Sequence, residues 1–427
     1  MSEHDRVTAL VADQLIDGTG RDPLRDTVVV WEGDRISAVG TRSTVNIPQD
    51  AEVIEGHGLT VLPGLMDMHV HLCAQAGMDF VATMMTRPAY ALLLAVPHCA
   101  ATLRAGFTTV RDAGGTPAGV RRAVDDGLFP GPRMRLSVSI LSQTGGHGDP
   151  MFPCGAEIRF ASVIDVPDGR VDGVDGMRRR VREVLRAGAD VIKLCASGGV
   201  LSVGDFPDTP EFTVEEIAAA VAEASVRGGH VLAHAMSAQG IKNALRAGVR
   251  SVEHGCLLDE EGIALLLERD AFLVPTLVAP HDVLAVAEAH PERIPEEMVD
   301  KCHRVSRMHM DAFRAAVDAG VNIALGTDSG VGAHGRNGRE LALMVEGGLT
   351  PMAAITAATA APARLLGLAD DLGTLAPGRI ADLIAVAGDP LEDISILGRP
   401  GTIRVVVKGG NTVLGPSESP VLTVATV

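Results

Sequence analysis

Two histidines separated by one residue, His69 and His71, stand at the end of the apolar run VLPGLMDMHVHL, just after Asp67. In a β-strand, residues two apart point to the same face, so both imidazoles project together from the end of the strand. Two neutral imidazoles that converge on one point form half of a site for a divalent metal ion. A buried strand whose histidines are hydrogen-bonded inside a core would give the same pattern, so other residues must decide.

Four other residues that can bind a metal ion also lie at or near the ends of apolar runs. They are Lys193 in VIKLCASGG, His234 in VLAHAM, His254 in SVEHG and Asp328 in ALGTDSG. In a barrel of alternating strands and helices, chemistry gathers at the carboxyl ends of the strands. The sequence therefore predicts that these four side chains meet the two histidines at one mouth.

Lys193 is flanked by Val191, Ile192 and Leu194, and burying its charge on such a strand would be costly. Desolvation lowers the pKa of a buried lysine and exposes a neutral amine. That amine can add carbon dioxide to form a carbamate, whose two oxygens can bridge two cations. Schiff-base chemistry of a lyase and a plain ion pair with a carboxylate are the alternatives. The metal bridge is favoured, because a lyase leaves the histidines unexplained.

The elements that must position these residues are short apolar runs that alternate with helical patterns between about Thr60 and Gly330. Eight such units indicate a (β/α)8 barrel, whose parallel strands are apolar throughout because both of their faces are buried. A doubly wound open sheet is the competitor, but no GxGxxG turn follows the first strand. The flanks show alternating, turn-rich stretches typical of short antiparallel strands. We predict an α/β protein in which residues 1–59 and 370–427 form a composite β-sandwich and residues 60–369 form the catalytic barrel.

Composition restricts the partners and the compartment. The net charge of −17 disfavours nucleic acid and anionic membranes. No run of about 18 apolar residues is present, and the start of the chain is charged where a secretory signal would be apolar, so we expect a cytoplasmic protein. The six cysteines are scattered without paired spacing, which favours reduced thiols used in packing.

Together these motifs resemble the amidohydrolase superfamily, and most of all its prolidase-like branch of metal-dependent dipeptidases and N-acyl amino acid hydrolases. PGLMDMHVHL and LAPGRIADLIAV are similar to motifs of the whole superfamily, while TGGHGD and KLCASGGV are similar to motifs of the branch. The resemblance implies two divalent metal ions, usually zinc, and a homo-oligomeric state. It implies one ion bound by His69, His71, carboxylated Lys193 and Asp328, and a second bound by Lys193, His234 and His254.

The implied reaction is hydrolysis of a peptide-like or N-acyl amino acid amide by a metal-bridged hydroxide. Asp328 would act as general base and then as general acid. His147, in the glycine-rich segment SQTGGHGDP, is expected to donate to the oxyanion and to contact substrate. His334 and Asn337 follow the eighth apolar run and are further candidates for binding substrate. A catalytically silent scaffold on this fold is disfavoured, because every expected ligand is present.

The expected substrate is a small molecule. The branch typically has a tyrosine two residues after the fifth-strand histidine, where it helps to bind a carboxylate, but here that residue is Met236. This departure favours less polar substrates, such as N-acylated aromatic amino acids, ochratoxin-like toxins, or xenobiotic amides and carbamates. The methionine-rich segment after His71 either walls a pocket or packs on the barrel. Asp112 either orients a ligand histidine or caps the following helix.

Overall fold

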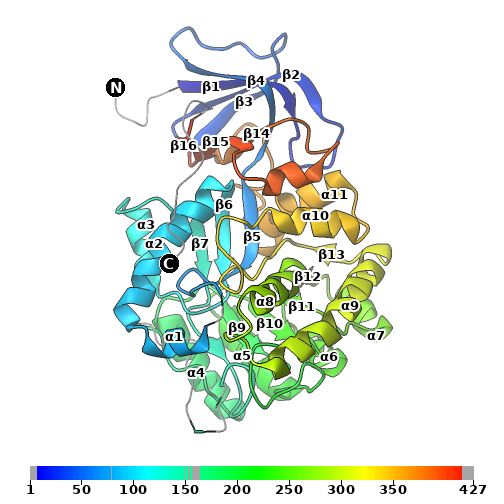
Figure 1. Cartoon of the computed structure of the whole chain (residues 1–427). Coiled ribbons are helices and arrows are strands. Elements are labelled where there is room, and N and C mark those ends of the chain that lie inside the picture. Colours follow the sequence, from blue (N-terminus) through cyan, green and yellow to red (C-terminus); the bar gives the residue numbers. More distant parts are fainter. Residues whose placement is uncertain (1–6, 78, 150, 152–153, 156–163, 416–427) are drawn as a thin grey trace.

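The structure is a computed structural model of the chain that describes residues 7–77, 79–149, 151, 154–155 and 164–415. Figure 1 shows a smaller sheet, built from the blue and the orange-red ends of the chain, above a larger barrel of strands surrounded by helices. Among the described residues, no helix has the length and apolar character that a membrane crossing requires.

The flanks of the chain share one mixed sheet of seven strands, ordered β16-β15-β14-β4-β1-β2-β3. The N-terminal and C-terminal parts join where β4 pairs antiparallel with β14. The sheet curls on itself, since Trp31 of β2 donates from Nε1 to the carbonyl of Gly410 beyond β15, at 2.9 Å. Its strands are β1 (Val7–Leu15), β2 (Leu24–Glu32), β3 (Arg35–Thr41), β4 (Glu52–Pro63), β14 (Leu383–Ala387), β15 (Ile403–Lys408) and β16 (Asn411–Leu414).

The barrel consists of a three-stranded sheet, β5-β6-β7, and a six-stranded sheet from β8 to β13. The third position is divided, because β7 pairs with β6 whereas β8 pairs with β9. The barrel closes where the amides of His71 and Asp328 donate across the first and last strands. Its strands are β5 (Leu65–Val70), β6 (Phe107–Asp112), β7 (Arg133–Leu136), β8 (Ile140–Leu141), β9 (Ile192–Cys195), β10 (Val231–Ala235), β11 (Ser251–His254), β12 (Phe272–Val274) and β13 (Asn322–Ile323).

The helices surround the barrel and cover its strands. Thr213 and Glu216 form a capping box at the start of α5, and Gly248 ends α6 with φ of 93°, a conformation that glycine adopts without strain. The helices are α1 (Phe80–Met85), α2 (Pro88–Arg104), α3 (Ala118–Asp125), α4 (Val174–Arg186), α5 (Val214–Ser225), α6 (Ala238–Ala247), α7 (Glu260–Glu268), α8 (Val278–Ala289), α9 (Glu296–Asp318), α10 (Arg339–Glu346), α11 (Pro351–Ala357), α12 (Ala360–Leu365) and the 3-10 helix η2 (Ile394–Gly398).

The predicted barrel with a β-sandwich-like sheet from both flanks is confirmed. Strands β5, β6, β9, β10 and β11 are buried along their whole length, as parallel strands covered by helices should be. One detail differs: residues 60–63 extend β4 of the flank sheet, because they pair with β14. The chain therefore enters the barrel at Leu65, past the predicted limit at residue 59, and the division into domains stays a prediction.

Candidate active site

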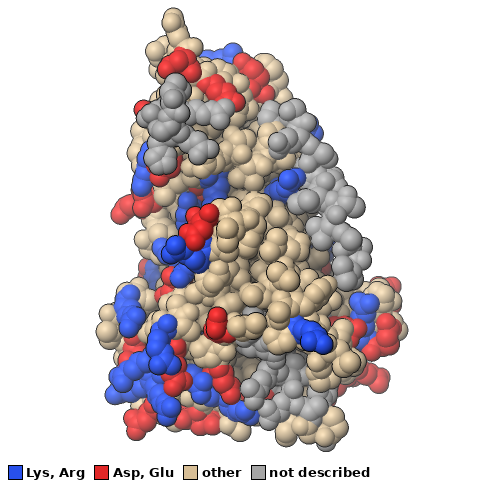
Figure 2. Space-filling view, turned by 90° about the vertical axis from the view of Figure 1, so that its left-hand side faces the viewer, with Lys and Arg blue, Asp and Glu red and all other residues tan. Residues whose placement is uncertain are grey.

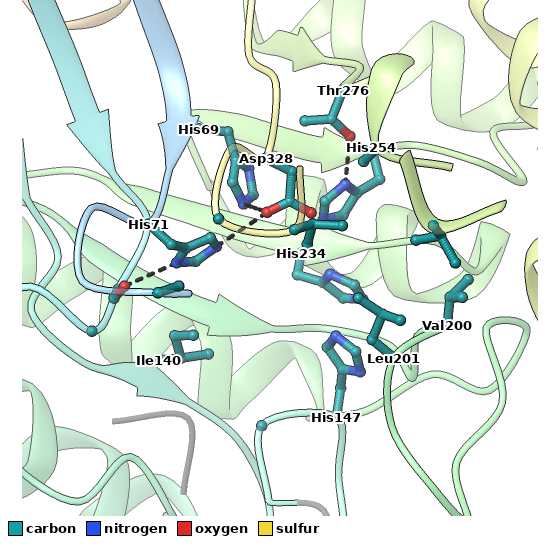
Figure 3. A pocket seen from close by; sticks show the side chains of 18 of the residues that line it. His69, His71, Ile140, His147, Val200, Leu201, His234, His254, Thr276 and Asp328 are labelled. Carbon is teal, nitrogen blue, oxygen red and sulfur yellow. Dashed lines mark hydrogen bonds and ion pairs between the residues drawn. The ribbon is translucent and has the colours of Figure 1, made fainter. Parts of the chain in front are cut away.

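A cavity of about 250 Å³ opens at the carboxyl ends of the barrel strands. All six predicted metal ligands line it, together with two of the residues predicted to bind substrate, His147 and Met236. Figure 3 shows the four ligand imidazoles and the Asp328 carboxylate gathered around one space, with His147 below His234. The sequence prediction of one shared mouth therefore agrees with the position of these side chains.

The first cluster joins the first and last strands of the barrel. His69 and His71 direct their Nε2 atoms toward Asp328, whose Oδ1 lies 3.6 Å from the former and 3.2 Å from the latter. The amide of Asp328 donates to the carbonyl of His69 at 2.7 Å, which fixes the two elements together. Asp328 adopts φ of 58°, in the left-handed region that is costly for residues with a side chain.

The second cluster comes from β9, β10 and β11. Lys193 places Nζ 3.5 Å from His69 Nε2, and the ring of His254 lies 5.0 Å from that of His69. One ligand atom each from His69, His254 and Asp328 lies within 4.8 Å of the other two. His234 packs 4.6 Å from His254, but its Nε2 lies 3.2 Å from the carbonyl of Gly198 and is directed at the backbone.

Three of these histidines hold their outer nitrogen on a fixed partner. His69 donates from Nδ1 to Glu253 at 2.8 Å, and His71 donates from Nδ1 to the carbonyl of Gly114 at 2.9 Å. The Nδ1 of His254 lies 2.7 Å from the hydroxyl of Thr276. Glu253 and the Gly114 carbonyl can only accept, so they fix a proton on Nδ1 of His69 and His71 and turn Nε2 of both rings inward, as in histidines that bind metal ions.

The charge state of the buried groups suits a cation. Burial lowers the pKa of His69, His234 and His254 well below the usual range, so these rings are neutral and can donate a lone pair. Burial also lowers the pKa of Lys193. Among the described residues no carboxylate forms an ion pair with that amine, which weakens the ion-pair interpretation. The donor set therefore fits a divalent metal ion.

A buried ion pair beneath the cavity was not foreseen from the sequence. Arg111 of β6 is fully buried and donates from Nη2 to Glu253 Oε1 at 2.8 Å. It also donates from Nε to the carbonyl of Met68 at 2.7 Å, and Ser251 donates to Glu253. An arginine in one buried strand and a glutamate in another could have indicated this pair, because buried charges need partners.

Two residues predicted to bind substrate lie away from the cavity. Asn337 is buried and donates from Nδ2 to Asp67 Oδ2 at 2.7 Å, so its amide is used in holding the strand. His334 stacks on His98 with the ring centres 4.3 Å apart, and its Nε2 lies 3.2 Å from the carbonyl of His71. Their positions indicate support of the ligand-bearing loops instead of contact with substrate.

The structure also decides between two alternatives for Asp112. Its Oδ2 accepts from the amide of Leu72 at 2.8 Å, and its Oδ1 accepts from the amide of Gly114 at 3.0 Å. Both groups adjoin His71, because Gly114 carries the carbonyl that binds the His71 ring. Asp112 therefore positions a ligand histidine through the backbone.

The methionine-rich segment forms α1 and the start of α2. Met84 and Met85 point outward with 46% and 80% of their surface exposed, and Met78 lies outside the described residues. Other residues of the segment line the cavity instead, among them Gln75, Thr83, Thr86 and Pro88. The two exposed methionines therefore do not wall the pocket.

Comparisons with known proteins show the family to which this chain belongs. Residues 60–413 match the Amidohydrolase family. Ochratoxinase of Aspergillus niger is 36% identical over 98% of this chain and 89% of its own length. A crystal structure of a Xaa-Pro dipeptidase with methionine bound in the active site is 37% identical, has a TM-score of 0.88, and is matched over 96% of this chain and 100% of that chain.

The crystal structure of A. niger ochratoxinase is similar as well. It has a TM-score of 0.84 and 34% identity, over 97% of each chain. The family match and the relatives that align along nearly the whole chain agree with the site geometry. This chain therefore belongs to the amidohydrolase family, and it is an enzyme that hydrolyses C–N bonds.

Proposed function

We propose that this protein hydrolyses small amide substrates with two bound divalent metal ions, preferably zinc. Two such metal ions lower the pKa of a water that they share and polarise a carbonyl group. The bridging ligand would be a carbamate formed from Lys193 and carbon dioxide. The first ion would be bound by His69, His71, Lys193 and Asp328, and the second by Lys193, His234 and His254.

The observation that carries this proposal is the orientation of the imidazoles. His69, His71 and His254 each direct Nδ1 to a partner outside the cavity, so the Nε2 atoms of all three rings face the inside. Lys193 adds support, because an amine buried beside the neutral rings of His69, His234 and His254 is otherwise a costly misfit. The family to which the chain belongs is generally metal-dependent.

Two side chains would handle protons and charge during hydrolysis. Burial opposes ionisation of Asp328, but the hydrogen bond of His71 and the positive charges nearby outweigh burial and hold the pKa of Asp328 below its usual range. An ionised Asp328 can take a proton from the attacking water and return it to the amine that leaves. His147 lines the opposite side of the cavity and would donate to the carbonyl oxygen as negative charge develops there.

The walls of the cavity favour a substrate with a bulky uncharged group. Beyond the ligands, the side toward α8 and α9 is lined by apolar side chains: Val200, Leu201, Met236, Ala279, Pro280, Val283 and Val305. Cys256 and Cys302 also line this side, and burial raises the pKa of both thiols, to about 11 for Cys302, so they remain neutral thiols.

Two substrate classes follow from this wall and from the relatives. A dipeptide, as the name of the similar Xaa-Pro dipeptidase suggests, or an N-acyl amino acid is one candidate. A less polar amide or carbamate, of mycotoxin or xenobiotic type, is favoured by the apolar thioether of Met236 at the position where the branch has a tyrosine.

A metal and activity assay tests the proposal. Purified protein should contain about two divalent ions per chain, and a chelator should abolish hydrolysis, which zinc should restore. The substrates would be N-acyl amino acids, dipeptides, aryl carbamates and uncharged anilides. A metal-free chain that hydrolyses them equally well would overturn the proposal, and borohydride trapping of Lys193 with a carbonyl compound would support the lyase alternative.

We also propose a cytoplasmic homo-oligomer. The described cysteines are all free thiols, which agrees with a reducing compartment. Figure 2 shows a broad area with few charges on the side where α1 and α2 lie. There Val81, Met85 and Leu93 are 66%, 80% and 63% exposed, and apolar patches of this kind favour association. Light scattering would give the mass in solution, and a mass of one chain would refute the oligomer.

A further inference from the structure

The loop after β9 contains polar residues that no metal site requires. It carries Ser202 and Asp205, both buried, close to the cavity. Ser202 Oγ lies 2.7 Å from Nδ1 of His147, and the Oδ2 of Asp205 lies 3.4 Å from the same nitrogen. The hydroxyl of Ser202 donates to Oδ1 of Asp205. We infer that Asp205, acting with Ser202, is a positioning residue that aims His147 at the substrate carbonyl.

The hydrogen-bond directions determine which nitrogen of His147 faces the substrate. Ser202 has a single hydroxyl proton, which it gives to Asp205, so its oxygen can only accept from Nδ1–H of His147. Nδ1 therefore donates to Ser202, and Nε2, on the opposite side of the ring, is the nitrogen that faces the cavity. Nε2 can donate to the substrate carbonyl only when it also carries a proton, and the nearby carboxylate of Asp205 would then stabilise the positive charge of the ring, as the aspartate does in a serine-protease triad.

The surrounding structure holds this arrangement rigidly. The His147 ring stacks on His234 with the ring centres 4.2 Å apart and the planes 20° from parallel. The amide of His147 donates to the buried carboxylate of Glu211 at 2.7 Å. Lys301 of α9 donates to the carbonyl of Ser202 at 2.8 Å and lies 3.6 Å from Asp205. The ring, its backbone and its carboxylate partner are therefore all tied to fixed elements.

The two glycines of the motif KLCASGGV are explained by the same contacts. A Cβ on Gly199 would lie 2.3 Å from Cε1 and 2.6 Å from Nδ1 of His147, so a side chain there would displace the ring. A Cβ on Gly198 would lie 2.9 Å from Oδ2 of Asp205 and 2.3 Å from the carbonyl of Phe206. The absence of both side chains allows the imidazole and the carboxylate to approach each other.

The inference rests on the proposed role of His147, and a double-mutant cycle tests it. With a substrate that the wild-type enzyme hydrolyses, Asp205→Asn should lower kcat by about 10–100-fold and change KM by less than about 3-fold, as loss of an outer-shell partner does. His147→Gln should lower kcat at least as much. The double variant should be no slower than His147→Gln alone, within about 2-fold, because Asp205 acts only through that ring.

Controls separate positioning from folding. Asp382→Asn removes a buried carboxylate that binds Arg133 far from the cavity, and it should leave kcat unchanged. Metal content should stay at the wild-type value in every variant. Should Asp205→Asn fail to fold, Ser202→Ala carries the same test, with an expected fall in kcat of about 3–10-fold. The inference would be overturned if kcat of the double variant fell by the product of the two single losses, or if Asp205→Asn left kcat unchanged. A wild-type enzyme without activity would instead count against the proposed function.

Discussion

Glu253→Gln probes the charged residues beneath the cavity, because Glu253 joins the ligand His69 to Arg111. All three side chains are at most 1% exposed, and both carboxylate oxygens are used, one at 2.8 Å from His69 Nδ1 and one at 2.8 Å from Arg111 Nη2. Glutamine keeps the shape but removes the charge. Its amide cannot accept from His69 and from Arg111 with both terminal atoms, so one buried donor loses its partner.

The size of the effect follows from the distance and the burial. At 2.8 Å, an effective dielectric constant of about 20 gives an attraction of about 6 kcal/mol before desolvation is subtracted. Breaking a buried pair on one side typically costs about 3–5 kcal/mol, since a charge remains without a partner. We expect the free energy of unfolding of the metal-free protein to fall by this amount. Metal affinity should fall about 10–100-fold, because His69 loses its anionic acceptor.

Urea denaturation followed by circular dichroism, and zinc titration of the folded variant, would measure the two quantities. Glu223→Gln is the matched control, since Glu223 binds Arg182 at 2.7 Å on the surface and its loss should cost less than about 1 kcal/mol. Adding Arg111→Met to Glu253→Gln should recover at least about 2 kcal/mol relative to the sum of the single changes. A Glu253→Gln protein as stable as the control, with unaltered zinc affinity, would refute the reasoning.

Three further changes test other parts of the site. Lys193→Met removes the proposed carbamate, so bound metal measured by mass spectrometry should fall from about two ions per chain to one or none. The metal-free protein should become more stable by about 1 kcal/mol, because a buried amine is removed. Unchanged metal content would contradict the proposed role of Lys193 as a ligand. Met236→Tyr should raise kcat/KM for an N-acyl amino acid relative to its methyl ester by about tenfold, since a phenol can donate to the carboxylate, and equal ratios in both proteins would show that this position does not select for charge. Burial raises the pKa of Glu211 from 4.5 to about 7, so its contribution to stability is full below pH 4.5 and is lost as the pH rises toward 7. Compared with Glu211→Gln, the wild-type free energy of unfolding should therefore fall by about 3 kcal/mol more over that interval, and parallel pH curves would argue against a protonated Glu211.

The strand ends are the part of this protein that the sequence predicts best. The runs that end in His69, Lys193, His234, His254 and Asp328 are apolar because parallel strands in a barrel are buried on both faces. A metal-ligand type at the end of such a run can be recognised without any knowledge of its neighbours. Local sequence therefore indicated the fold class and the six candidate ligands that line the cavity.

Tertiary structure alone decided which polar residues support those ligands. Asp205 acts on a histidine that lies far away in the chain, and Asn337, expected at the substrate, instead binds Asp67. Neither of these contacts can be predicted from the spacing of residues in the sequence, because the loops that carry Asp205 and Asn337 have no regular repeat. Sequence fixes which residues a strand end offers, since burial and periodicity are local properties. Hydrogen-bond partners depend on where separate loops meet, and only the packed barrel brings them together.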